Sequence, residues 1–393
     1  MKEKVTYDLL SKKNAVLVGE GFKDPDKKIP ATVVGVSKKV PKTQLKSKDI
    51  IPEVVNHKPT KVIEIGEIFL RTSNAEGQSN AEGQSNADEQ AEGQSNADEQ
   101  AEFCFSQEPE YPHDSDKIAH ALTNSIMSED EASSETAKLK SKASKDTKAR
   151  YRPVFGGISI GHKDITCGTL GMIVYKDHFP YILSNNHVMA NVNKADIGDP
   201  IYQPGPYDGG TEEDTIALLH SYVPISCIDD QPISNCKIAN TVAYICNRVA
   251  ALFGSKTRLS PRKSVATNLV DCALGIMCSP TEAENKILHY GIPGVFSDVS
   301  VGEQVKMCGR TSGISRGELA VTNATVRVNM GNGKIAVFED QLTFDMKSQG
   351  GDSGSVILRD KDNAVVSLLF AGSTEYTIGN KIANVLDALE LSE

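Results

Sequence analysis

The chain has 393 residues, 39% of them hydrophobic and 24% charged, so it can bury a large core and hold more than one domain. Its net charge is −10, and residues 71–102 alone carry eight acids and one base, which leaves −3 elsewhere. That balance argues against a basic surface for nucleic acid. No stretch of 18 apolar residues occurs, which excludes a membrane-spanning helix. The N-terminus lacks a secretory signal pattern, so we expect a cytoplasmic protein with its eight cysteines reduced.

Residues 1–70 are predicted to form a small α/β domain. Short runs rich in β-branched residues at 15–19, 31–36 and 60–65 are typical of strands, and a charged turn separates the first two. No nucleophile–base pair and no phosphate-binding loop occurs in this part. Its role is therefore either assembly or regulation, or simple packing on the remainder of the chain.

Residues 71–150 are predicted to be an acidic repeat and disordered linker. Residues 73–102 repeat the pattern Ser-Asn-Ala-Glu-Gly-Gln in degenerate copies that contain no large apolar side chain. Such a segment cannot build a core. It matches no family that we can identify, and we interpret it as a spacer of variable length.

From Tyr151 onward, short strands and glycine turns predict a mostly β domain that extends to residue 393. Two strand-like runs, 167–175 and 181–189, are joined by a hairpin-like connection, and the second runs into a polar turn that carries His187. Apolar residues recur at helical spacing in 239–253 and in 382–389. We expect the first to be a helical insertion and the second a closing helix.

Asp271 lies inside the apolar run 268–275. Burying a carboxylate is costly unless it has a partner, and an imidazole N–H is the partner that would make it useful for catalysis. Asp214 and the pair Asp229–Asp230 also lie between His187 and the serine discussed next. They occupy polar, turn-like surroundings and stay open as alternatives.

The most informative segment is Gly350-Gly351-Asp352-Ser353-Gly354-Ser355, which lies between two strand-like runs. A serine hydroxyl is a weak nucleophile unless the fold aims it and a base takes its proton. Flanking glycines allow a tight turn that exposes the Ser353 hydroxyl and lets the amides of Gly351 and Ser353 point at one spot. A developing oxyanion could bind there. The order His187, Asp271, Ser353 is that of the chymotrypsin triad.

These stretches resemble the trypsin-like serine peptidases of the chymotrypsin superfamily, and most of all the bacterial group related to the plant NARROW LEAF protein. The resemblance is carried by the stretches "CGTLGMIVY", "YILSNNHVMAN", "GRTSGISRGELAVTNATVRV" and "GGDSGSVIL", spread from about residue 156 to the C-terminus. It implies a chymotrypsin-like double β-barrel over 151–393. It also implies a serine endopeptidase without a cofactor or metal, in which His187, Asp271 and Ser353 are catalytic.

Substrate-binding residues follow only from this resemblance. Lys347, six residues before the serine, matches the position that forms the floor of the primary pocket in trypsin-like relatives, and would favour an acidic residue before the scissile bond. The alternative is that it points to solvent. Gly372 is expected on the edge strand that pairs with the substrate backbone. In the superfamily, the counterpart of Asp352 can pair with a new N-terminus, but Pro153 disfavours such a cleavage, so we expect a preformed site.

We expect a protein or peptide substrate, no nucleic-acid or membrane partner, and a homo-oligomer, as relatives suggest. A different class of function also stays open. The chain could be a catalytically silent peptide-binding or oligomeric scaffold protein that keeps the protease fold. Labelling by a fluorophosphonate distinguishes the two, because only an activated serine reacts.

Overall fold

The computed structural model describes residues 2–71, 146–228, 236–255, 257–261 and 267–391. The predicted repeat at 73–102, and nearly all of the predicted linker at 71–150, lie outside the described residues, as do Asp229 and Asp230. The described residues up to Arg71 and those from Thr147 onward belong to one compact unit.

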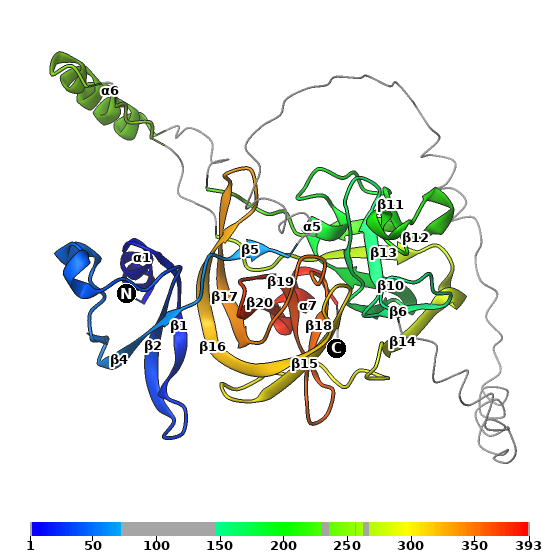
Figure 1. The fold of residues 1–393 in the computed structure, drawn as a ribbon. Coiled ribbons are helices and arrows are strands. Elements are labelled where there is room, and N and C mark those ends of the chain that lie inside the picture. Colours follow the sequence, from blue (N-terminus) through cyan, green and yellow to red (C-terminus); the bar gives the residue numbers. More distant parts are fainter. Residues whose placement is uncertain (1, 72–145, 229–235, 256, 262–266, 392–393) are drawn as a thin grey trace, which may run out of the picture. The chain divides into compact units, whose positions relative to one another are not determined.

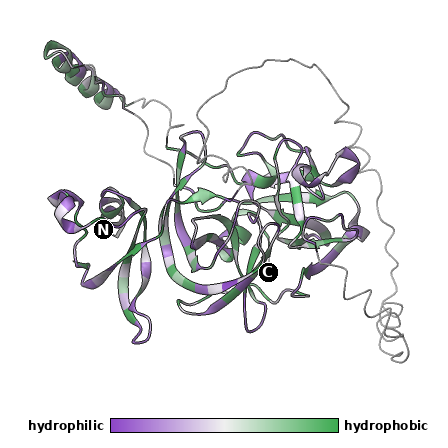
Figure 2. Ribbon diagram, in the orientation of Figure 1, coloured by the Kyte–Doolittle hydropathy of each residue, from purple (hydrophilic) through white to green (hydrophobic). Residues whose placement is uncertain are grey.

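The C-terminal part contains a closed barrel of six antiparallel strands. Their ring order is β15-β18-β19-β20-β17-β16, and β16 pairs with β15 again to close it. The strands are β15 (Gln304–Gly309), β16 (Gly313–Asn329), β17 (Ile335–Asp345), β18 (Val356–Arg359), β19 (Val365–Gly372) and β20 (Tyr376–Lys381). Closure pairs the strands of the ring with one another, which limits edge-to-edge association in small all-β folds, and it leaves parts of β16 and β19 to pair with other strands of the chain. In Figure 2, apolar and polar residues alternate along β16, whose buried and less buried positions also alternate over much of its length.

A second antiparallel sheet of seven strands lies between the linker and the closed barrel in the sequence. Its order is β8-β7-β11-β12-β13-β10-β9. The strands are β7 (Ser159–His162), β8 (Gly168–Thr169), β9 (Met172–Lys176), β10 (Phe179–Ser184), β11 (Pro200–Tyr202), β12 (Thr215–Tyr222) and β13 (Ala273–Met277). A small parallel pair, β6 (Val154–Gly156) and β14 (Ala283–Ile287), accompanies it. One apolar core joins this sheet to the closed barrel, because Ile182 and Leu274 cluster with Leu358 and Leu368.

Three helices accompany these sheets. The short α5 (Asn186–Met189) follows β10, α6 (Lys237–Leu252) is inserted between β12 and β13, and α7 (Ile382–Ala388) follows β20 and buries its apolar face in the core. The predicted mostly β fold, with a helical insertion and a C-terminal helix, is confirmed. Of the two predicted barrels, one is a closed ring of strands, and the other is a sheet of seven strands whose end strands β8 and β9 do not pair with each other.

The N-terminal part contributes a helix and strands to the same unit. They are α1 (Lys2–Leu10), β1 (Ala15–Asp24), β2 (Ile29–Val36), β3 (Val54–Val55), β4 (Lys58–Glu64) and β5 (Phe69–Leu70). The three strands that the sequence predicted correspond to β1, β2 and β4 (Figure 1). Strand β1 pairs with β16, and Leu17 and Val33 share a core with Phe338 and Phe370. This part therefore extends the sheet of the closed barrel and shares its core.

Candidate active site

The two sheets supply different halves of the candidate site. His187 lies on α5, directly after β10, and Asp271 lies just before β13, the strand that pairs with β10. The His187 Nδ1 and the Asp271 Oδ2 are 2.5 Å apart, and the His187 backbone N–H donates to the other carboxylate oxygen at 3.3 Å. Both side chains are fully buried. The pairing of β10 with β13 thus positions the imidazole against the carboxylate.

Two asparagines hold the backbone around Asp271. The Asn185 side chain donates to the Asp271 carbonyl at 2.7 Å, and the Asp271 amide donates to the Asn380 Oδ1 at 3.0 Å. Asn380 belongs to β20 of the closed barrel and also donates to Gln341 at 2.7 Å. A buried chain of hydrogen bonds therefore ties the aspartate to the closed barrel.

The Cys272 thiol lies next to this aspartate in the sequence. Burial and, to a smaller extent, the negative charge of Asp271 raise the pKa of the thiol well above its usual value.

The serine loop connects β17 to β18, on the closed barrel. Gly351 and Gly354 have φ angles of +97° and +93°, a conformation that other residues rarely adopt. The fully buried Asp352 carboxylate accepts hydrogen bonds from the amides of Thr311 at 2.8 Å, Ser312 at 2.9 Å and Gln349 at 2.8 Å. These donors stabilise the carboxylate from within the fold, so the loop keeps its shape without an ion pair to a chain terminus.

Ser353 and His187 are not hydrogen-bonded to each other. The Ser353 hydroxyl donates to the Phe370 carbonyl at 3.1 Å, and the buried His187 Nε2 has no hydrogen-bond partner in the described part of the chain. The imidazole is thus held at Nδ1, whereas the buried Nε2 makes no hydrogen bond with the described residues.

The segment that ends at Arg71 lies on the serine half of the site. Strand β5 pairs antiparallel with the end of β19, with Leu70 opposite Ala371 and Phe69 opposite Gly372. The Arg71 amide donates to the Phe370 carbonyl at 3.1 Å, and the Arg71 carbonyl accepts from the Gly351 amide at 2.6 Å. A peptide carbonyl of this chain therefore binds the Gly351 amide, one of the two amides to which the sequence assigns an oxyanion.

The structure places the other predicted site residues as follows. Gly372 lies at the end of β19, against Phe69. Lys347 is 73% exposed and forms an ion pair with Glu375 at 3.3 Å, so it points to solvent and does not form the floor of a pocket. The alternative acid Asp214 pairs with Arg150 at 2.7 Å, and, although burial opposes the effect, this hydrogen bond helps to hold its pKa below the usual value.

Sequence reasoning missed Asn380 and Arg71. Nothing in the local pattern distinguishes Asn380 from other strand residues, because its role depends on contacts across the two sheets. Arg71 follows three apolar residues, 68–70, which would have indicated a further strand, yet the sequence analysis placed a domain boundary there.

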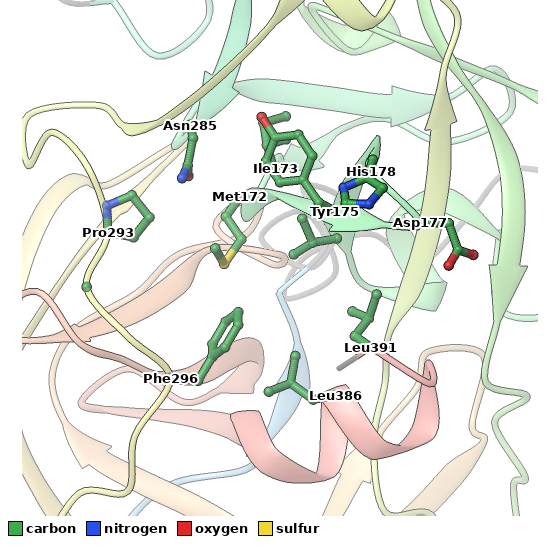
Figure 3. A pocket seen from close by; sticks show the side chains of 12 residues that line it. Met172, Ile173, Tyr175, Asp177, His178, Asn285, Pro293, Phe296, Leu386 and Leu391 are labelled. Atoms are coloured by element: carbon green, nitrogen blue, oxygen red, sulfur yellow. The ribbon is translucent and has the colours of Figure 1, made fainter. Parts of the chain in front are cut away.

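A separate cavity lies away from the triad residues. Its volume is about 780 Å³, and it lies between β9 and the C-terminal helix α7 (Figure 3). Met172, Tyr175, Phe296 and Leu386 are among its lining residues, but none of the triad residues is. Among the described residues, no group of three or more His, Cys, Asp or Glu side chains could hold a metal ion, and no helix is long and apolar enough to cross a membrane.

Comparison with known proteins gives low similarities. No family model matches the sequence, and no curated protein matches it. Similar solved structures include the Nocardiopsis protease NAPase (12% identity, TM-score 0.38) and Thermobifida fusca protease A (14% identity, TM-score 0.38). The Cellulomonas bogoriensis chymotrypsin is 13% identical, with a TM-score of 0.37. Each match covers 60% of this chain and 96% of the other. At these values the function has to be inferred from the geometry of the site.

Proposed function

We propose that the protein is a serine endopeptidase that hydrolyses peptide bonds through His187, Asp271 and Ser353. The buried His187–Asp271 pair is the observation that carries this proposal. A carboxylate bonded to Nδ1 fixes the imidazole tautomer that leaves Nε2 ready to accept a proton, and it stabilises the imidazolium that follows. Nε2 is the atom without a partner among the described residues.

In the proposed reaction, the Ser353 hydroxyl turns from the Phe370 carbonyl towards Nε2 and attacks the carbonyl carbon of the substrate. His187 takes the hydroxyl proton and then gives it to the leaving amine, and water resolves the acyl-enzyme by the reverse route. The Gly351 amide, which already binds a peptide carbonyl at 2.6 Å, stabilises the oxyanion together with the Ser353 amide.

Several finer statements belong to the same proposal. We place the chain near the NARROW LEAF-related group, as a cytoplasmic homo-oligomer acting on proteins or peptides, without nucleic-acid or membrane partners. The oligomeric state is open to test by light scattering during size-exclusion chromatography, where a monomer of the 42.3 kDa chain would contradict it.

A silent peptide-binding protein is the second candidate, because the Ser353 hydroxyl binds a backbone carbonyl and β5 already pairs with the end of β19 beside the serine loop. We call this place, where a substrate backbone would pair with β19, the groove. Prolonged labelling with a fluorophosphonate, localised by peptide mass spectrometry, decides between the two. We expect Ser353 to be labelled, and Ser353→Ala to abolish labelling. The control Ser297→Ala removes a surface hydroxyl and should change nothing. Unlabelled Ser353 in every form of the protein would favour the silent binder.

A further inference from the structure

Residues 69–71 lie in the groove as a peptidase substrate would lie. The strand pairs antiparallel with β19, the Arg71 amide binds the Phe370 carbonyl, and the Arg71 carbonyl binds the Gly351 amide beside Ser353. Backbone pairing with an edge strand is a general way to hold an extended peptide. The carbonyl carbon of Arg71 is therefore the peptide carbon presented to the nucleophile, and the bond it makes to Thr72 is the bond at risk.

The side chain of Arg71 is bound by two hydrogen-bond acceptors, at Ser348 and Ser373, which together with Gly372 we call the arginine pocket. Its Nε donates to the Ser348 hydroxyl at 3.2 Å, and its Nη2 donates to the Ser373 carbonyl. Ser348 and Ser373 are each only 4% exposed. A guanidinium has five N–H donors and no acceptor, so it suits these partners, whereas a carboxylate would face a carbonyl oxygen. Lys347, with its charge directed to solvent, does not reverse this preference.

Gly372 provides the space that the arginine needs. A Cβ atom at this position would lie 2.8 Å from the Arg71 Nε and 2.9 Å from Nη2. Both separations are closer than real Cβ contacts, so a larger residue at 372 would displace the guanidinium. The Cβ would also lie 2.6 Å from the Tyr376 carbonyl oxygen, so the backbone requires a glycine here as well. Two features thus favour an arginine side chain at this place: the lack of a side chain at Gly372, and the hydrogen-bond acceptors at Ser348 and Ser373.

We propose that this pocket is the primary specificity pocket, that it selects arginine before the scissile bond, and that the protein cleaves its own chain between Arg71 and Thr72. This inference rests on the proposed peptidase function and names its substrate class. The Ser353 Oγ forms a bond to the Arg71 carbonyl carbon, and the bond from that carbon to the Thr72 nitrogen breaks as His187 protonates the amine. Water then releases Arg71 as a carboxylate and regenerates the serine.

Cleavage would not by itself release the N-terminal part. Strand β1 would still pair with β16, and Leu17 and Val33 would remain in the core shared with Phe338 and Phe370. The new Arg71 carboxylate would stay beside the Gly351 amide and compete with other substrates. The protein after cleavage is thus a complex of two fragments, which separate only on denaturation.

The first test is the intact mass of purified protein under denaturing conditions. We expect wild type to give fragments 1–71 and 72–393, Ser353→Ala to give one chain of 393 residues, and Arg71→Glu to stay uncut at 71. Arg71→Lys should still be cut, and the control Lys46→Ala, at an exposed site in the same part of the chain, should behave as wild type. Cleavage of Ser353→Ala at 71 would assign the cut to another protease and overturn the inference.

A second test separates this inference from the proposed function. Ser353 of Arg71→Glu should be labelled by a fluorophosphonate faster than Ser353 of wild type, because the variant lacks the guanidinium bonds to Ser348 and Ser373 that help to hold residues 69–71 in place. It should cleave a Phe-Leu-Arg chromogenic amide with kcat/KM about 100-fold or more above that of the Phe-Leu-Glu amide. The inference would be wrong if Ser353 is labelled but the chain is not cut at 71 and arginyl substrates are not preferred. That result would still be consistent with the proposed peptidase function. Absence of labelling in both proteins would remove the proposed function itself.

Discussion

The two halves of the site differ in what completes them. On the histidine half, every contact described above comes from the two sheets. The Asp271 carboxylate binds His187, and Asn185 and Asn380 bind the backbone of Asp271. The serine half is completed by a segment more than 270 residues away in the sequence, because Arg71 binds the Gly351 amide and pairs beside Phe370. The position of His187 is therefore set by contacts within the two sheets, whereas the surroundings of Ser353 also depend on residues 69–71.

This difference shows which hydrogen bonds of the site a bound substrate would replace. A peptide entering the groove would have to replace the Arg71 backbone at Gly351 and Phe370, but would leave the His187–Asp271 bond untouched. Variants on the histidine half should therefore act mainly on kcat. Variants in the pocket should act mainly on KM.

The largest effect is expected on the nucleophile. Ser353→Ala should keep the fold, because the lost hydroxyl makes only one hydrogen bond, at 3.1 Å, to a backbone carbonyl. Peptidase activity should fall on the order of a million-fold in kcat, as when the serine of such a triad is removed. The measurement is hydrolysis of an arginyl peptide amide by purified proteins with equal melting temperatures. Comparable rates for the variant and the wild type would show that Ser353 is not the nucleophile.

The next largest effect is expected from changing Asp271, which is hydrogen-bonded to His187. Asp271→Asn should leave the backbone bonds to Asn185 and Asn380 in place but favour the wrong imidazole tautomer, lowering kcat by about 10⁴. Asp214→Asn is the matched control, since Asp214 pairs with Arg150, whereas His187 pairs with Asp271. An active Asp271→Asn beside an inactive Asp214→Asn would mean that the acid of the triad has been assigned wrongly.

A smaller effect is expected from narrowing the pocket on the serine half. In Gly372→Ala, the new Cβ would meet the Arg71 guanidinium and lie 2.6 Å from the Tyr376 carbonyl, so the pocket loses room for arginine. We expect KM for arginyl substrates to rise about tenfold or more. Fluorophosphonate labelling should persist, because a small probe need not enter the pocket. Unchanged KM in a stably folded variant would place the specificity pocket elsewhere.

The same contrast explains how far the sequence could predict the structure. The mostly β fold follows from short strands and glycine turns, and the serine loop from two glycines that adopt positive φ. The sequence can predict these features because each depends on the conformational preferences of the residues that form it. Asn380 and Arg71 act instead through contacts across sheets and over long sequence separations, which no local pattern encodes.

The smallest effect is expected at Lys347. Its place in the sequence, six residues before Ser353, could not show whether its side chain points into the site or to solvent. Its ammonium is directed to solvent and pairs with Glu375 across a surface where both side chains are more than half exposed. Exposed ion pairs contribute little to stability, and screening by water weakens their influence on a buried pocket. Lys347→Ala should therefore change KM for arginyl and glutamyl substrates by less than about twofold. A marked loss of activity towards the glutamyl substrate alone would restore the acidic preference that the resemblance implied, and would mean that the lysine turns inward when substrate binds.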